Sequence, residues 1–171
     1  CFYHPEDDAA LKVQQQEKLL ALYQAARKVG RELLVEIIAG KHGELHDDTI
    51  ARALELLYAL GIKPDWWKLE PQNSAAAWAK TEAVIKKHDP WCRGIVVLGL
   101  DAPIDALQQS FQSCADAGLV RGFAVGRTIF AETARGWLAG DVGDEKAIDE
   151  MAQRFDTLCT LWLQCRGNTH G

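Results

Sequence analysis

The chain has 171 residues, of which 48% are hydrophobic and 25% are charged, and its formal net charge is −5. These values are typical of a globular protein, and we expect residues 1–171 to form a single domain. Acidic and basic residues are interspersed without a basic stripe, which argues against a nucleic-acid partner. No apolar run approaches the roughly 20 residues that span a bilayer, and no basic-then-apolar leader is present, so neither a membrane partner nor a secretory signal is expected.

The five cysteines are scattered along the chain, and no Cys-x-x-Cys pair occurs. An odd and scattered set argues against a disulfide framework and against a structural zinc site. Reduced thiols in a cytoplasmic protein are the simpler interpretation. The chain opens on Cys1 and apolar residues, not on methionine, from which we expect that it begins inside a larger protein.

Strand and helix patterns alternate along the chain. The expected strands are 1–4, 32–38, 65–70, 94–100 and 122–126, and the expected helices are 9–29, 47–60, 74–88, 103–117 and two more from about 128 and 144. Strand centres recur about every 30 residues, the size of a βα unit. This alternation predicts an α/β fold with a parallel sheet, either doubly wound or a barrel.

Five strands cannot close an eight-stranded barrel, so barrel material of this length would be a partial barrel. The strands lack a clean alternation of apolar and polar residues, which predicts that both faces of the sheet are covered. The tail 167–171 is expected to be disordered.

The segment Pro64-Asp65-Trp66-Trp67-Lys68-Leu69-Glu70-Pro71 is the most informative in the chain. Because strand side chains alternate, Trp66, Lys68 and Glu70 are expected on one face. A lysine within an apolar strand is costly to bury without a partner or a task. Lys68 is therefore either a Schiff-base lysine, whose neutral amine attacks a carbonyl, or a member of a structural ion pair with Glu70 or Glu36.

Glu36 lies within the apolar run Leu34-Val35-Glu36-Ile37-Ile38, one expected strand away from Lys68. A carboxylate at this place suits a general acid/base, which the formation of a carbinolamine and C–C cleavage both require. A neighbouring carboxylate also favours the protonated amine, which opposes nucleophilic attack. The sequence leaves this conflict open.

The segment Gly122-Phe123-Ala124-Val125-Gly126-Arg127-Thr128-Ile129-Phe130 reads as a strand, a tight turn and a helix start. Gly126 would let a ligand approach the backbone, Arg127 would add a bidentate cation, and Thr128 is placed to cap the helix. The pattern suits a phosphate site, although an exposed arginine in a surface turn is an alternative. The turn at Gly99 would offer further N–H donors, whereas Asp101 is interpreted as a helix cap without a ligand role.

Histidines in two loops are weaker candidates. His42 and His46 lie near Asp47 and Asp48 with a spacing that could bind a metal, but the segment is not convincingly helical and no metal site is predicted. His4 ends the first expected strand, where it either lines the site or is a satisfied structural histidine.

Three of these segments carry a family resemblance: Tyr3-His4-Pro5-Glu6-Asp7-Asp8, the Pro64–Pro71 segment and the Gly122–Phe130 segment. They resemble the aldolase-like domain fused to the C-terminus of 5-dehydro-2-deoxygluconokinase in bacterial inositol catabolism. That domain is similar, more remotely, to class I tagatose-1,6-bisphosphate aldolases, which are metal-independent barrels of TIM type. The family begins with a strand carrying a Phe-Asp-His-Arg-like motif that this chain lacks, so the chain matches strands four to eight only.

The resemblance implies a class I aldolase, a carbon–carbon lyase without a cofactor, acting on a phosphorylated keto-sugar acid. It assigns the Schiff base to Lys68, the acid/base role to Glu36 and the phosphate site to Gly126 and Arg127. The strand and turn patterns add Gly99, Glu70, Trp66 and His4 as further candidate site residues. The expected partners are a small phosphorylated sugar and either a second copy of the chain or a sugar kinase domain. The alternative function is a non-catalytic sugar-phosphate-binding module that regulates such a kinase.

Overall fold

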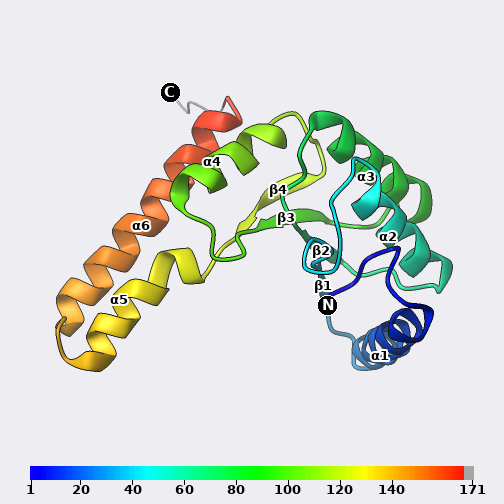
Figure 1. The fold of residues 1–171 in the computed structure, drawn as a ribbon, viewed down its shortest axis with the longest axis horizontal. Coiled ribbons are helices and arrows are strands. Elements are labelled where there is room, and N and C mark those ends of the chain that lie inside the picture. The colour runs from blue at the N-terminus through cyan, green and yellow to red at the C-terminus, as the bar shows by residue number, and fades with distance from the viewer. Residues whose placement is uncertain (168–171) are drawn as a thin grey trace.

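The computed structural model of the chain describes residues 1–167, and residues 168–171 of the expected tail lie outside the described residues. Four parallel strands form one sheet in the order β1-β2-β3-β4, as Figure 1 shows. The elements are α1 (Ala9–Lys28), β1 (Leu34–Ile37), α2 (Thr49–Ala59), β2 (Trp66–Leu69), α3 (Ala75–His88), β3 (Gly94–Leu98), α4 (Ile104–Ser113), β4 (Val120–Ala124), α5 (Arg127–Ala139) and α6 (Asp144–Cys165). The expected α/β class with a parallel sheet is confirmed, and the sheet is not closed into a barrel within the described residues.

The first expected strand is reduced to a single parallel bridge between Phe2 and Ile38. The N–H of Tyr3 donates to the carbonyl of Ile38 at 3.1 Å, and the N–H of Ile38 donates to the carbonyl of Cys1 at 2.9 Å. The chain start therefore continues the sheet beyond β1 in the expected direction, but over too few residues to form a full strand.

Strand pairing places the central residues of the four strands in one row. Glu36 pairs with Lys68, Lys68 with Val96, and Val96 with Gly122. Because strand neighbours alternate faces, this row lies on one face of the sheet while Val35, Trp67 and Ile95 lie on the other. The register alone thus brings Glu36 beside Lys68.

The two faces of the sheet differ in burial, contrary to the expectation that both are covered. Val35, Trp67 and Ile95 are buried against α2 and α3, and the indole N–H of Trp67 donates to the Tyr58 hydroxyl at 2.8 Å. On the other face, the side chains of Glu36 and Lys68 are 34% and 25% exposed to solvent. The inner face of an eight-stranded barrel is covered by side chains from opposing strands, and four strands supply too few of them.

Helix ends follow local capping chemistry in several places. The carboxylate of Asp8 accepts hydrogen bonds at the start of α1, and the hydroxyl of Ser74 does so at the start of α3. Gly61 adopts a φ of +79° directly after α2, as expected of a glycine that ends a helix. These signals are local, so the sequence predicts these three ends within two residues.

The sequence is less accurate around β4. The strand begins at Val120, two residues earlier than expected, because the pairing with β3 is irregular between Ile95 and Val96. Helix α4 also ends at Ser113 instead of continuing to 117. The guanidinium of Arg166 donates to the carbonyls of Cys114, Ala115, Ala117 and Val120 at 2.9–3.0 Å and stacks over Trp162. An arginine 46 or more residues away thus provides hydrogen-bond donors for the carbonyl groups of the irregular backbone between α4 and β4.

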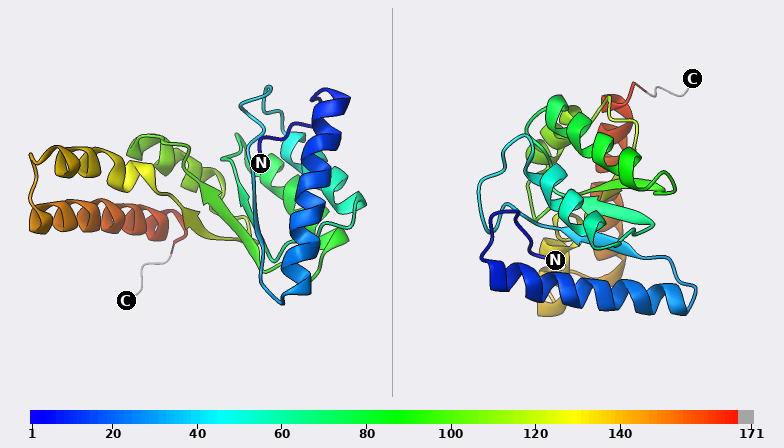
Figure 2. Two further views of the ribbon diagram at one scale, coloured as in Figure 1. Left: turned by 90° about the horizontal axis from the view of Figure 1, so that it is seen from below. Right: turned by 90° about the vertical axis from the view of Figure 1, so that its right-hand side faces the viewer.

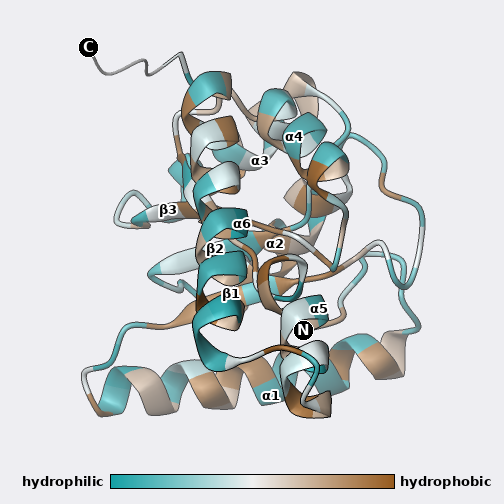
Figure 3. Cartoon of the chain, turned by 90° about the vertical axis from the view of Figure 1, so that its left-hand side faces the viewer, coloured by the Kyte–Doolittle hydropathy of each residue, from teal (hydrophilic) through white to brown (hydrophobic). Residues whose placement is uncertain are grey.

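The helices divide into two groups around the sheet. Helices α1, α2 and α3 lie at the β1–β2 end, and α4, α5 and α6 lie at the β3–β4 end, where α6 packs on α4 and α5 (Figure 1). Helices α5 and α6 form an antiparallel hairpin that projects beyond the sheet (Figure 2). Figure 3 shows that brown apolar turns alternate with hydrophilic ones along this hairpin, where Trp137, Leu138 and Ile148 are exposed. Among residues 1–167, no helix has both the length and the apolar composition needed to cross a membrane.

Asp65 joins three segments at the amino-terminal end of the sheet. Its Oδ2 accepts hydrogen bonds from the N–H of Leu33 at 2.9 Å and from the Arg27 guanidinium at 2.8 Å. Partial burial of this carboxyl acts to raise its pKa, but the bonds from Leu33 and Arg27 outweigh burial, and the pKa lies below its usual value. The stabilisation is therefore fully present above the pKa of about 3.9 that an unfolded aspartate has, and it is lost as pH falls through the folded value.

An Asp65→Asn variant is expected to be less stable than wild type by about 1 kcal/mol at pH 7, because the charge-assisted bonds are weakened. The difference in unfolding free energy should shrink as pH falls below about 4 and approaches the lowered pKa at which the folded wild-type carboxyl becomes neutral. Urea unfolding at a series of pH values measures this difference. A gap that stays constant down to pH 2 would show that the charge of Asp65 contributes nothing.

Candidate functional site

The candidate site lies at the carboxyl-terminal edge of the sheet, on the half-exposed face. A cavity of about 260 Å³ opens there, and its lining includes Glu36, Lys68, Gly99, Asp101, Gly126 and Arg127. Ligands of parallel α/β proteins bind at this edge, because the loops after the strands converge on it. The structure therefore brings five of the eight sequence-predicted site residues to one cavity.

Lys68 and Glu36 form the polar centre of the cavity. The Lys68 Nζ lies 2.8 Å from Glu36 Oε1, and both side chains are partly exposed to the cavity. The contact follows from the register, which places the two residues directly opposite each other on adjacent strands. Of the two ion-pair partners considered for Lys68, the structure selects Glu36. The arrangement can pass a proton between an amine and a carboxylate at the mouth of a cavity.

The second half of the cavity is formed by the loops after β3 and β4. Gly126 is the N-cap of α5 without a side-chain cap, and Arg127 is the first residue of the helix. A side chain at position 126 would meet the Phe130 ring at 3.1 Å, so glycine keeps the cavity open here. The N-terminus of α5 and the Arg127 guanidinium together offer N–H donors and positive charge to an anion.

The two loops are connected by side chains. The Thr128 hydroxyl donates to the carbonyl of Ala102 at 2.8 Å, and Arg127 Nη1 lies 3.5 Å from Asp101 Oδ2. Both expectations for helix caps are wrong here. Thr128 lies inside the first turn of α5 and does not cap it, and α4 begins after Pro103, so Asp101 is too far upstream to be its cap.

Asp101 is a cavity residue that the sequence did not identify, and its backbone is unusual. Leu100 and Asp101 have φ of +47° and +67°, and the N–H of Ala102 donates to the carbonyl of Gly99 at 2.8 Å. Positive φ at both central residues of such a turn normally selects glycine, asparagine or aspartate. Asp101 fits this preference and Leu100 does not, so the pair gives only half of the signal in the sequence.

Glu70 does not line the cavity. The strand ends at Leu69, so the alternation that placed Glu70 beside Lys68 no longer applies. Its buried carboxylate instead accepts the N–H groups of Ala39 and Gly40, at 2.6 and 2.9 Å. Glu70 therefore holds the loop after β1 and has no contact with Lys68 at ion-pair distance among the described residues.

Trp66 and His4 also lie outside the cavity lining. Trp66 shares the face of Lys68 but begins β2, at the opposite end of the strand from the cavity. The buried ring of His4 is occupied by the backbone, because its Nδ1 accepts from the N–H of Glu6 at 3.1 Å and its Nε2 lies 3.2 Å from the carbonyl of Glu44. His4 thus corresponds to the satisfied structural histidine that the sequence left as an alternative.

The two loop histidines, His42 and His46, contact different carboxylates. His42 Nδ1 lies 2.9 Å from Asp7 Oδ1, and His46 Nε2 lies 4.0 Å from Glu44 Oε2. In the part of the chain from 1 to 167, no three His, Cys, Asp or Glu side chains are grouped in a way that would hold a metal ion.

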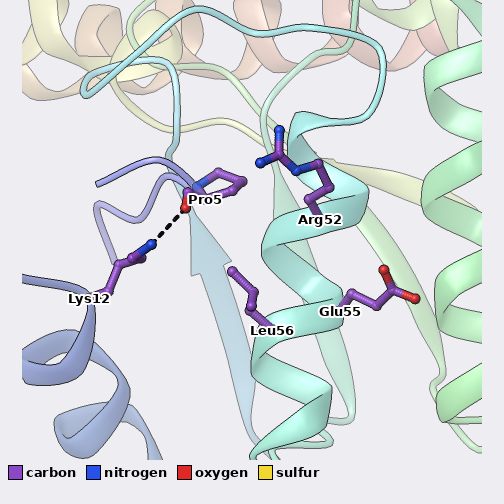
Figure 4. A pocket seen from close by; sticks show the side chains of 5 residues that line it. All are labelled: Pro5, Lys12, Arg52, Glu55 and Leu56. Carbon is purple, nitrogen blue, oxygen red and sulfur yellow. Dashed lines mark hydrogen bonds between the residues drawn. The ribbon is translucent and has the colours of Figure 1, made fainter. Parts of the chain in front are cut away.

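A larger cavity, of about 390 Å³, lies between α1 and α2 and is lined by Pro5, Lys12, Arg52, Glu55 and Leu56 (Figure 4). Its charged groups already have partners: the Lys12 amine donates to the Pro5 carbonyl at 2.9 Å, Arg52 pairs with Glu6, and Glu55 pairs with Lys87. None of the sequence-predicted site residues reaches it. The cavity at the sheet edge is the better candidate site, because five of the sequence-predicted site residues meet there.

Comparisons with known proteins agree with the fold. The fructose-bisphosphate aldolase from Plasmodium falciparum is similar in structure, with a TM-score of 0.53 and 13% sequence identity over 82% of this chain. The match covers 47% of the aldolase, so the chain spans about half the length of that protein. This likeness supports an α/β fold related to part of an aldolase barrel, and at such low identity it shows the fold alone.

No curated protein matches the sequence. A family model described as "Uncharacterized protein conserved in bacteria (DUF2090)" matches residues 1–166, which is nearly the whole chain. The chain therefore belongs to this family.

Proposed function

We propose that this chain carries the Schiff-base centre of an aldolase, with Lys68 as the nucleophile. The observation that carries the proposal is the Lys68–Glu36 pair, 2.8 Å apart, at the edge of a cavity whose other side holds Arg127. Amine, acid/base and anion-binding group are the three parts that such a reaction needs. The aldolase fold of the structural neighbour agrees with this combination.

In the proposed reaction, the neutral amine of Lys68 attacks the ketone carbon of the substrate. Glu36 accepts the proton that the amine loses, and solvent water donates a proton to the ketone oxygen, which becomes the hydroxyl of a carbinolamine. Glu36 then returns a proton to this hydroxyl, which leaves as water and produces an iminium ion. Glu36, now ionised, accepts the proton of the hydroxyl on the β carbon, and the bond between the α and β carbons breaks. The β carbon leaves as an aldehyde, and the iminium accepts the bonding electrons to give an enamine. Protonation and hydrolysis of the enamine release the ketone product and regenerate Lys68.

The phosphate of the substrate is assigned to Arg127 and the backbone around Gly126 and Gly99. Anchoring a phosphate away from the reacting carbon orients the scissile bond and reduces the entropic cost of reaction. By its family resemblance, we propose 6-phospho-5-dehydro-2-deoxygluconate as the substrate, with dihydroxyacetone phosphate and malonate semialdehyde as products. The proposed reaction belongs to inositol catabolism and takes place in the cytoplasm. The proposed partner of the chain is a fused or associated sugar kinase domain or a second copy of the chain.

A second candidate function is a sugar-phosphate-binding module without catalysis. The observation that favours it is the closed Lys68–Glu36 ion pair, since an amine held as an ammonium is not a nucleophile. Lys68 would then stabilise the sheet, and Arg127 would still bind a phosphate. The two functions differ in whether Lys68 reacts.

Borohydride trapping tests the proposal. The protein is incubated with dihydroxyacetone phosphate, reduced with sodium borohydride, digested and mapped by mass spectrometry. We expect one reduced adduct, on Lys68, which a Lys68→Met variant loses completely. A Lys63→Met variant is the matched control, because Lys63 is exposed and lies before β2, away from the cavity. Phosphate binding without an adduct on Lys68 would favour the non-catalytic module.

A further inference from the structure

The charges that line the candidate cavity balance each other. Lys68 and Arg127 are the cations among the described lining residues, and Glu36 and Asp101 are the carboxylates. Each cation has one carboxylate beside it: Lys68 Nζ lies 2.8 Å from Glu36, and Arg127 Nη1 lies 3.5 Å from Asp101. The proposed reaction uses Lys68 for chemistry, so one cation of the lining, Arg127, is left for a phosphate.

Asp101 is held in the cavity at a conformational cost. A non-glycine residue with positive φ is strained, and two in succession persist only where surrounding contacts hold them. The hydrogen bonds of Ala102, from its N–H to Gly99 and from Thr128 to its carbonyl, hold this turn against the start of α5. The turn thus keeps a carboxylate next to the cation that the phosphate needs.

We propose that Asp101 is a specificity-determining residue that restricts the cavity to ligands with a single phosphate group. This inference rests on the proposed function, because it assigns the phosphate to Arg127. Repulsion between the Asp101 carboxylate and a ligand grows with the negative charge of the ligand. A second phosphate would meet this repulsion and would find no further cation in the described lining of the cavity. The favoured class of substrate is therefore a monophosphorylated sugar or sugar acid.

The Asp101→Asn variant is well suited to test this inference. Asparagine tolerates positive φ at least as well as aspartate, so the turn is expected to survive while the charge is removed. The matched control is Asp105→Asn, which removes the same charge from an exposed position in the first turn of α4, outside the cavity lining. Arg127→Met identifies the binding that depends on the proposed phosphate site.

The experiment compares dissociation constants for fructose 6-phosphate and fructose 1,6-bisphosphate by isothermal titration calorimetry at low ionic strength. We expect the wild-type protein to bind fructose 1,6-bisphosphate no more tightly than fructose 6-phosphate. In Asp101→Asn, affinity should rise about 2-fold for the monophosphate and about 5-fold for the bisphosphate, the range of an exposed ion pair. In Asp105→Asn, both constants should stay at their wild-type values.

An equal change for the two ligands in Asp101→Asn, or the same change in Asp105→Asn, would overturn the inference and leave the proposed function in place. If no binding depends on Arg127, the inference falls together with the phosphate assignment. Borohydride trapping on Lys68 remains an independent test of the Schiff-base chemistry, so the two failures are distinguishable.

Discussion

A Glu36→Gln variant is expected to form the Lys68 adduct about 100- to 1,000-fold more slowly than wild type, the usual contribution of a general acid/base. Glu36 Oε1 lies 2.8 Å from the Lys68 Nζ, within direct proton-transfer distance. Glutamine has nearly the same size and can still accept a hydrogen bond, but it cannot take the proton from the amine or return one to the carbinolamine. The loss should therefore appear in the rate of adduct formation, with little change in phosphate affinity, because Arg127 pairs with Asp101 and not with Glu36.

The rate is measured by stopping the reaction with borohydride after increasing times and quantifying the reduced Lys68 peptide. Glu32→Gln is the matched control, because Glu32 precedes the same strand but pairs with Arg93 and lies outside the cavity lining. It should react at the wild-type rate. Equal rates in Glu36→Gln and wild type would mean that the ion pair is structural, and the acid/base assignment would then be wrong.

A Glu70→Leu variant is expected to lose about 3 kcal/mol of unfolding free energy, because the buried N–H of Ala39 and the part-buried N–H of Gly40 lose their acceptor. The carboxylate of Glu70 is 3% exposed and accepts the N–H groups of both Ala39 and Gly40. The loop also packs directly on it, since a side chain at position 40 would lie 3.0 Å from Glu70 Oε1.

Urea unfolding followed by tryptophan fluorescence measures this loss. Glu70→Gln keeps one acceptor oxygen and should lose about half as much, whereas Glu44→Gln changes an exposed carboxylate and should stay within about 0.5 kcal/mol of wild type. A Glu70→Leu variant as stable as wild type would show that the loop after β1 does not depend on this carboxylate. The result also bears on the site, because this loop begins two residues after the strand that carries Glu36.

Local signals in the sequence determined most of the fold. The βα repeat of about 30 residues predicted the parallel sheet, and the helical patterns located helices at 9–29, 47–60 and 74–88. Alternation within strands placed Glu36 and Lys68 on the inner face, and the pairing of consecutive strands made them neighbours. These features depend on residues close in sequence and on the regular geometry of strands, which is why they can be predicted without a structure.

The tertiary structure decided what lies outside the strands and what covers the sheet. Glu70 turns away from Lys68 because the strand ends at Leu69 and two N–H groups, 30 and 31 residues away, need an acceptor. Asp101 lies beside Arg127 because its turn adopts positive φ. The turn contains no glycine at its central positions, so this conformation was not predicted from the sequence. The face of the sheet that carries Glu36 and Lys68 remains half exposed, contrary to the expectation that both faces are covered. Each outcome depends on contacts between distant segments, which local sequence patterns do not encode.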